Sequence, residues 1–248
     1  MKSYLKISLF FICLVTAASA QDLPKVQQVS LYAPNNKPED LFTASAGKFQ
    51  AYNKGNHLYY TIANDADNLY LVVHTADKLT IQKIIRWGLA LSTSTSGKIT
   101  PGSPSVSFPV PNGDNNFSII RTIGAEVATK ASFNTRMANQ CKLIAVKNLT
   151  GLNGPIISVY NNDGVKALAS FNDQLEYTYE LTVPLKYLNI SVKDQTPFHY
   201  DIKLNGANSN ARPGAPPGPK RKDGRSIPDN DYLYSPTNFG GTCTLAAK

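Results

Sequence analysis

The sequence predicts an all-β fold, an antiparallel two-sheet β-sandwich of jelly-roll-like character with few short helices. Many short runs of strand-favouring residues follow one another from about residue 48 onward, and Gly, Asn, Asp or Pro bounds each run. Helical periodicity is sparse. Short strands at near-even spacing are typical of antiparallel sandwiches and barrels.

The predicted strands fall on both sides of the middle of the chain. Before it they are Phe49–Tyr52, Leu58–Ala63, Leu69–Ala76, Trp87–Thr93 and Ser105–Val110. After it they are Lys142–Lys147, Ile156–Tyr160, Val165–Phe171, Glu176–Val183, Phe198–Leu204 and Gly241–Ala246. We expect a helix within Asn116–Arg136 and a single helical turn at Pro184–Leu188.

Residues 58–77, LYYTIANDADNLYLVVHTAD, predict a β-hairpin with an exposed turn at Asn64–Asp67. In that register one face, the core face, carries Leu58, Tyr60, Ile62, Leu69, Leu71 and Val73, and the other carries Tyr59, Thr61, Tyr70, Val72 and His74. A slip of one residue would mix the two sets. Asn and Asp tolerate turn dihedrals and bond to nearby amides, so the acidic interruption is interpreted as a turn. Calcium held by Asp65, Asp67 and a neighbouring loop is the alternative, although no ligands follow at EF-hand spacing.

Two later strands alternate in the same manner. In 176–183 the aromatic and aliphatic side chains alternate with Glu176, Thr178, Glu180 and Thr182, and 198–204 alternates likewise. This pattern predicts antiparallel strands with one buried and one solvated face.

The N-terminus resembles a secretory signal peptide, residues 1–20, with a basic start, an apolar stretch and an Ala18-Ser19-Ala20 cleavage site. We therefore expect a secreted or periplasmic product, residues 21–248, that forms one domain. A second apolar run of membrane-spanning length is not found in the sequence, so we do not expect the chain to span a membrane.

The charge does not indicate a nucleic-acid partner. Removing Lys2 and Lys6 from the 25 basic residues leaves 23 against 17 acidic ones, a net charge of +6. Much of the excess lies in a long Pro/Gly/basic loop at 205–231, in Lys220, Arg221, Lys222 and Arg225. An aromatic-interleaved basic stripe is missing. Loops of this length are usually functional or disordered.

Enzymatic motifs are not found. The sequence contains neither G-x-S-x-G nor H-E-x-x-H, and His57, His74 and His199 lack the spacing of a zinc site. Glu176 and Glu180 share a strand face, which an alternating strand displays to water by default. We expect no catalytic residues, no metal and no cofactor.

Cys141 and Cys243 are the cysteines of the mature chain. An oxidising compartment permits one disulfide between them, and two separate thiols are the alternative.

Aromatic side chains supply the candidate ligand site. Tyr59, Tyr70, His74 and Trp87 can assemble on one outer sheet face, where flat rings would stack on sugars. The alternative is that these rings fill the core, as large aromatics commonly do.

Four stretches resemble the secreted β-sandwich group of family 9 carbohydrate-binding modules and DOMON-like domains, of the kind found in Bacteroidetes envelope proteins. They are LYYTIANDADNLYLVVHTAD, RWGLALSTSTSGK, YELTVPLKYL and TNFGGTCTLA. The shared features are an Asn68-Leu69-Tyr70 strand after an Asp/Asn turn, Gly88 in a following strand, and Glu180 before Val183-Pro184-Leu185. The resemblance covers about residues 48–110 and 142–246.

The resemblance implies a sandwich that binds carbohydrate or a related envelope ligand without catalysis. Sugar-binding members hold the sugar between paired Trp residues, whereas this chain has Trp87 alone. Haem-binding relatives use Met and His ligands, and Met137 is not placed for that role. An envelope structural or protein-interaction module that uses the 205–231 loop is the second hypothesis, and a glycan-processing enzyme is the third.

Overall fold

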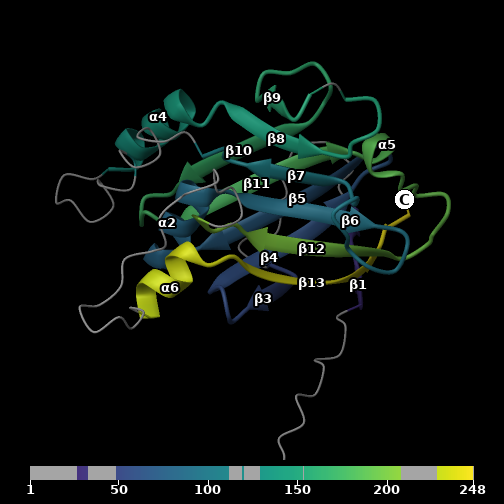
Figure 1. The fold of residues 1–248 in the computed structure, drawn as a ribbon, viewed down its shortest axis with the longest axis horizontal. Coiled ribbons are helices and arrows are strands. Elements are labelled where there is room, and N and C mark those ends of the chain that lie inside the picture. The colour runs from purple at the N-terminus through teal and green to yellow at the C-terminus, as the bar shows by residue number, and fades with distance from the viewer. Residues whose placement is uncertain are drawn as a thin grey trace, which may run out of the picture.

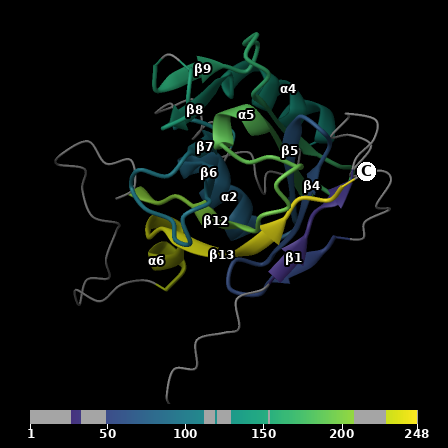
Figure 2. The same cartoon turned by 90° about the vertical axis from the view of Figure 1, so that its right-hand side faces the viewer.

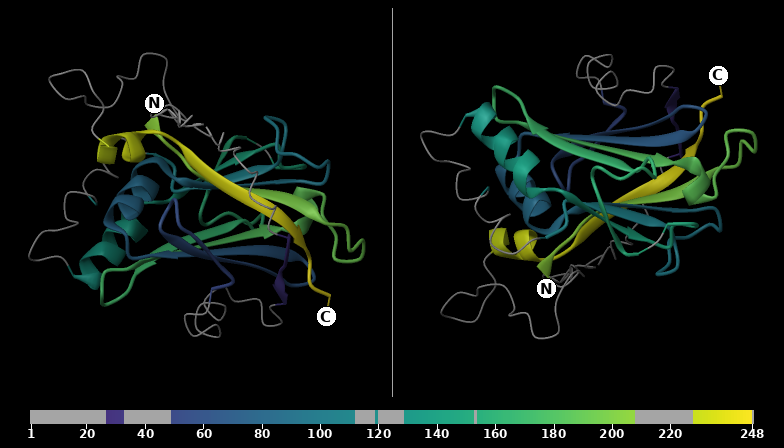
Figure 3. Two further views of the ribbon diagram at one scale, coloured as in Figure 1. Left: turned by 90° about the horizontal axis from the view of Figure 1, so that it is seen from below. Right: turned by 90° about the horizontal axis from the view of Figure 1, so that it is seen from above.

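The computed structural model describes residues 27–32, 49–111, 119, 129–152, 154–207 and 228–247, and over this part of the chain it confirms the two-sheet β-sandwich. The two sheets face each other across one core (Figure 3). The expected signal peptide lies outside the described residues. So does most of the 205–231 loop, including Lys220, Arg221, Lys222 and Arg225.

Seven strands form the first sheet, sheet A. They are β1 (Gln27–Val29), β6 (Leu89–Ser94), β7 (Ser105–Phe108), β8 (Leu143–Lys147), β9 (Ile156–Ser158), β12 (Phe198–Leu204) and β13 (Thr237–Thr244). Their order across the sheet is β1-β13-β12-β6-β7-β8-β9 (Figure 1). The β1–β13 pair is parallel, and the other pairs are antiparallel.

Six strands form the second sheet, sheet B. They are β2 (Leu31–Tyr32), β3 (Ala51–Asn53), β4 (Leu58–Asn64), β5 (Asn68–Thr75), β10 (Lys166–Phe171) and β11 (Tyr177–Pro184). The order is β10-β11-β5-β4-β2, with β3 also paired to β4. The strands β1 and β2 were not predicted, because two or three residues carry no readable periodicity.

The predicted register of the β4–β5 hairpin is confirmed. Tyr60 pairs with Val73 and Ile62 with Leu71. All six residues assigned to the core face are buried. Across the core, Tyr60 meets Tyr200 of β12, with ring centroids 6.3 Å apart and hydroxyls 3.1 Å apart. The inner faces of the two sheets therefore interdigitate through large side chains, as in other aligned sandwiches.

The solvated outer face predicted for sheet B is wrong in its central part. Thr178, Glu180 and Thr182 of β11 are buried, and so are Tyr70 and Val72 of β5. Part of this face lies against the segment before β3, where the Gln50 side chain accepts a hydrogen bond from Ile62 N at 2.8 Å. Alternation shows which residues share a face, but it does not show whether that face meets water. By contrast, β12 alternates between buried and half-buried residues as predicted.

The turn of the hairpin is only partly exposed. Ala66 and Asp67 are exposed, whereas Asn64 and Asp65 are buried, which corrects the expected turn. The Ser30 hydroxyl donates to Asn64 Oδ1, and Ala246 N donates to both Ser30 Oγ and Asn64 Oδ1 at 2.9 Å. Asn64 therefore ties this turn to the segment between β1 and β2 and to the end of β13.

Helices α2 (Lys78–Trp87), α4 (Lys130–Gln140) and α6 (Pro228–Tyr234) gather at one end of the sandwich, and α5 (Leu185–Leu188) lies at the other (Figures 1 and 3). The end view shows α2 and α6 beside β12 and β13 (Figure 2). Helix α4 begins inside the predicted Asn116–Arg136 segment and runs four residues beyond it. Helix α5 confirms the predicted turn. None of the helices in the described part of the chain could cross a membrane.

Helix α2 was not predicted, although its signals are present in the sequence. Asp77 caps it by accepting a hydrogen bond from Thr80 N at 2.8 Å. Ile81, Ile84 and Ile85 recur at helical spacing and are buried. The helix ends at Gly88, which has a φ of +85° and where a Cβ would lie 2.6 Å from Pro109 O. The strand predicted from Trp87 therefore begins at Leu89 instead.

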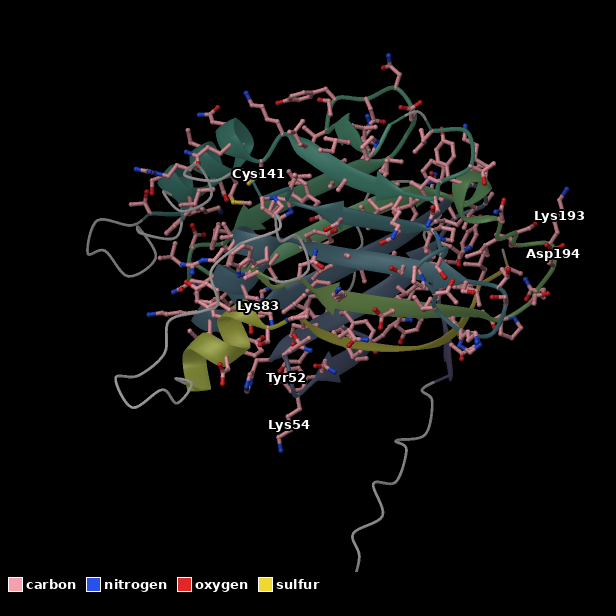
Figure 4. All side chains as sticks on the ribbon, viewed as in Figure 1. Tyr52, Lys54, Lys83, Cys141, Lys193 and Asp194 are labelled. Carbon is pink, nitrogen blue, oxygen red and sulfur yellow. The ribbon has the colours of Figure 1, made fainter. Side chains whose placement is uncertain are left out.

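Lys83 of α2 is fully buried (Figure 4). Its ammonium donates to Thr237 Oγ1 at 2.8 Å and lies 4.1 Å from the centroid of the Tyr232 ring of α6. Burial lowers the pKa of Lys83 to about 8. One hydroxyl and one aromatic ring replace only part of the hydration free energy that a charged amine loses on burial.

Candidate functional site

The structure brings together two of the four predicted site residues. Tyr59 of β4 and His74 of β5 are directly opposite each other on the outer face of sheet B. Tyr70 shares that face, but it is 1% exposed. Trp87 lies elsewhere, at the end of α2. The four side chains therefore do not form one open face. The predicted ligand platform required all four rings to be exposed together, and the structure does not place them so.

Tyr70 is buried because its hydroxyl serves the hairpin turn. It donates to Asp65 Oδ2 at 2.5 Å, while Asp65 Oδ1 accepts from Asp67 N at 2.7 Å and Asn68 N at 2.6 Å. Burial acts to raise the pKa of Asp65, but these hydrogen bonds outweigh it and the pKa is lowered. Burial and the Asp65 carboxylate both raise the pKa of Tyr70. Tyr70 and Asp65 form a structural unit of the turn.

Trp87 packs under helix α6. Its indole Nε1 donates to Leu233 O at 2.9 Å, and its ring centroid lies 5.8 Å from that of Tyr234. The neighbouring Arg86 donates to the Tyr234 hydroxyl at 2.9 Å. Because Trp87 belongs to the helix and not to a strand, the alternation used to place it on the sheet face did not apply.

An aromatic cluster does exist on the outer face of sheet B, and it consists of Phe49, Tyr52, Tyr59 and His74. Tyr52 and Tyr59 have ring centroids 4.5 Å apart and are 47% and 46% exposed. Phe49 packs on Tyr59 at 5.8 Å and stacks on His74 at 5.5 Å. Tyr52 pairs with Tyr59 across β3 and β4, so two rigid strands position the exposed rings.

Polar groups border the aromatic cluster. His74 Nδ1 lies 3.2 Å from Thr178 Oγ1, and its Nε2 lies 3.5 Å from Glu176 Oε2. Burial lowers the pKa of His74, and Glu176 opposes that shift in part. On the exposed side, the Tyr52 hydroxyl lies 3.4 Å from His57 Nδ1. The cluster thus combines stacking surface with hydrogen-bonding groups at its edge.

Sequence reasoning missed Tyr52 and Phe49 as site residues. Both lie in the predicted strand 49–52, so the signal was present. The pairing of that strand with β4 puts Tyr52 beside Tyr59, and this pairing is a tertiary fact that one-dimensional alternation does not contain.

Asp65 of the hairpin turn and Glu176, just before β11, accept local hydrogen bonds. The Asp65 oxygens accept from the turn amides and Tyr70, as turn chemistry predicts. Over the residues described, no group of three or more His, Cys, Asp or Glu could hold a metal ion. Glu176 accepts from Asn172 Nδ2 at 2.7 Å and Glu180 is buried.

Cys141 and Cys243 are separate buried thiols, so the possible disulfide is not formed. Cys243 lies on β13 and Cys141 just before β8, four strand positions away in sheet A. That distance is roughly 19 Å at ordinary strand spacing, well beyond the reach of a disulfide. Burial raises the pKa of each thiol to about 12. Cys141 contacts Met137 of α4, with the two sulfur atoms 3.9 Å apart.

Comparison with solved structures finds similar chains, among them two structures of family 9 carbohydrate-binding modules. No family model and no curated protein matches the chain. A family 9 carbohydrate-binding module from Caldicellulosiruptor kristjanssonii in complex with cellotriose is similar with a TM-score of 0.36 and 6% identity, over 90% of this chain and 95% of that chain. The same kind of module in complex with glucose is similar with a TM-score of 0.35 and 8% identity, over 90% and 96%. At these values the likeness assigns neither a family nor a function.

Proposed function

We propose that this protein is a secreted, non-catalytic carbohydrate-binding module that holds a sugar against the aromatic cluster. The observation that carries the proposal is the exposed Tyr52–Tyr59 pair, backed by Phe49 and His74. Contiguous exposed apolar surface on a protein is often an interaction or ligand site, and the two packed rings form such a surface. Secretion is supported by the signal-like residues 1–20.

Physical chemistry favours a sugar as the partner. Pyranose rings present flat C–H faces, and tyrosine offers a flat apolar ring with a hydroxyl at its tip. The rings are held by β3 and β4, so little side-chain freedom is lost on binding. Tyr52 projects at the edge of the molecule beside Lys54 (Figure 4), and His57 lies next to the Tyr52 hydroxyl. These groups can bond to sugar hydroxyls around the stacked ring.

Binding of a panel of neutral oligosaccharides, measured by calorimetry, tests the proposal. Tyr52→Ala and Tyr59→Ala should each weaken binding by about fivefold, since stacking on one ring contributes on the order of 1 kcal/mol. Tyr160→Ala removes a ring that is 72% exposed but lies outside the cluster, and it should change affinity less than twofold.

Equal affinity of both cluster variants and the wild type would disprove sugar binding at this site. The interaction-module hypothesis would then remain, and deletion of residues 208–226 would test it directly. Thermal melting of each variant controls for loss of fold. Both tyrosines are half-exposed, so the substitutions should leave the core intact.

A further inference from the structure

The outer face of sheet A contains a groove of about 800 Å³, a volume within the usual range of ligand sites. Its floor crosses β12, β6, β7 and β8, and the loop Ile99–Ser103 forms part of its wall. The groove is on the sheet opposite to the aromatic cluster, so the two sites are separate.

Small side chains create the groove. In one cross-strand row Asp201, Ser92, Ser105 and Lys147 follow one another, and in the next row Lys203, Ala90, Ser107 and Ala145 do so. A row that crosses four strands is about 14 Å long. The floor can therefore accept a short oligomer lying across the strands.

The polar groups of the groove are held in place by hydrogen bonds to one another. Ser92 Oγ donates to Ser105 Oγ at 3.0 Å, and Asn205 Nδ2 donates to Ser107 Oγ at 3.1 Å. Asn238 Nδ2 donates to Asp201 Oδ1 at 2.7 Å. The hydroxyls of Ser105 and Ser107 accept in these bonds and keep their own protons to donate. The floor is thus a preformed array of donors and acceptors.

The charges of the groove are two lysines and one carboxylate. Asp201 is half-buried, and burial raises its pKa, while Asn238 and Lys203 oppose the shift. Among the residues that the structure describes, neither Lys147 nor Lys203 makes an ion pair. With Asp201 ionised the groove carries one net positive charge, in a chain whose formal charge is +8. Such a surface attracts an anion.

We propose that this groove binds an acidic oligosaccharide, with sugar hydroxyls on the serines and Asp201 and a separate sugar carboxylate or sulfate at each of Lys147 and Lys203, which lie at opposite ends of the floor. An extended peptide fits less well, because the face of a sheet presents side chains and not the backbone groups on which strand addition depends. The proposal is independent of sugar binding at the aromatic cluster.

Calorimetry at low ionic strength with trigalacturonate, its methyl ester and a chondroitin sulfate tetrasaccharide tests the proposal. At least one acidic sugar should bind, the neutral ester should bind at least tenfold more weakly than trigalacturonate if that is the ligand, and added salt should reduce affinity. The double variant Lys147→Gln/Lys203→Gln should lose at least tenfold. Lys193→Gln removes one positive charge from a side chain that projects at the edge of the molecule (Figure 4) and does not line the groove, and it should change affinity less than twofold.

Two further variants separate the possible failures. Ala145→Leu fills the groove without changing its charge and should also weaken binding, whereas Tyr52→Ala/Tyr59→Ala should leave it unchanged. If neither acidic sugar binds, or if the double lysine variant binds like the wild type, the proposal is overturned. It is likewise overturned if tetraglutamate binds as tightly as the acidic sugars with the same dependence on Lys147 and Lys203, because the groove is then a peptide site.

Discussion

The two outer faces of the sandwich differ, although the strands of both sheets alternate in sequence. On sheet B, Thr61, Val72 and Glu180 are buried, and the exposed rings are confined to the aromatic cluster at the β3–β4 side. On sheet A the corresponding positions are alanines, serines and partly exposed charges that leave a groove. Side-chain size and charge at the outward positions distinguish a face that closes from one that stays hollow.

This difference bears directly on function. On the closed face of sheet B a ligand can reach only the edge, where Tyr52 and Tyr59 remain accessible. A site of this kind recognises a sugar ring by stacking. A hollow face offers a preformed floor of hydroxyl and charged groups, and such a site recognises a polar chain by hydrogen bonds and charge. The following predictions test how far the two faces differ, from the largest expected effect to the smallest.

A carboxylate introduced on each face should give the largest contrast. Val72→Asp places a charge at a position 2% exposed on sheet B and should destabilise by more than about 4 kcal/mol, since a buried unpaired charge keeps little of its hydration. Ala145→Asp on the sheet A face should change stability by no more than about 0.5 kcal/mol. Urea unfolding of both variants measures this, and similar losses in the two would show that the faces do not differ in burial.

The inner face of sheet B provides the reference for the outer one. Leu71 is next to Val72 and is fully buried between the sheets. Leu71→Ala should lower the free energy of unfolding by roughly 2–5 kcal/mol. This loss is the sum of the hydrophobic free energy of the deleted side-chain carbons and the cost of the cavity that they leave. A loss below about 1 kcal/mol in denaturant unfolding would contradict the assigned register, in which Leu71 faces Ile62.

Lys83 tests burial at the helical end of the sandwich. Its pKa, lowered to about 8, means that the folded protein releases this proton before the unfolded chain does. In the window from about pH 8 to about pH 10.4 the unfolded state binds more protons at Lys83, so the stability of the wild type relative to Lys83→Met should rise with pH by roughly 3 kcal/mol. Lys83→Met should be more stable than the wild type at pH 7 and should lack this rise. Urea unfolding of both proteins at several pH values across that window measures this. If the free energy of unfolding changes with pH equally in both proteins, the assigned burial of Lys83 is refuted.

Tyr70→Phe should cost about 1.5–3 kcal/mol at pH 7, because it removes a hydrogen bond to the Asp65 carboxylate. The lowered pKa of Asp65 contributes stability above the carboxyl's ordinary value, and that stability is lost as pH falls through the folded pKa. The variant should therefore lose less stability than the wild type between pH 5 and about pH 2. Carboxyl titration by NMR should show the pKa of Asp65 rising in the variant, and an unchanged pKa would rule out this role of Tyr70.

The sequence by itself determined the all-β class, the hairpin register at 58–75 and the bounds of β12, because alternation over seven or eight residues determines which side chains share a face. It also contained the signals of α2 in Asp77 and the isoleucine spacing. The Ile-rich run that follows Thr80 also has strand propensity, which competes with those helix signals. Because the predicted strand began at Trp87, the end of the helix at Gly88 was not recognised.

Only the tertiary structure decided which outer face is closed, which rings stay exposed and where the charges meet. Tyr59 and Tyr70 have the same sequence character and share a face, yet one is 46% and the other 1% exposed. Tyr59 packs against the exposed Tyr52 ring of the neighbouring strand, whereas the hydroxyl of Tyr70 bonds to the Asp65 carboxylate of the turn. Likewise, Asp201 and Lys147 join one groove because β12, β6, β7 and β8 lie side by side. Strand neighbourhood is set by the packing of the whole chain, and local periodicity carries no information about it.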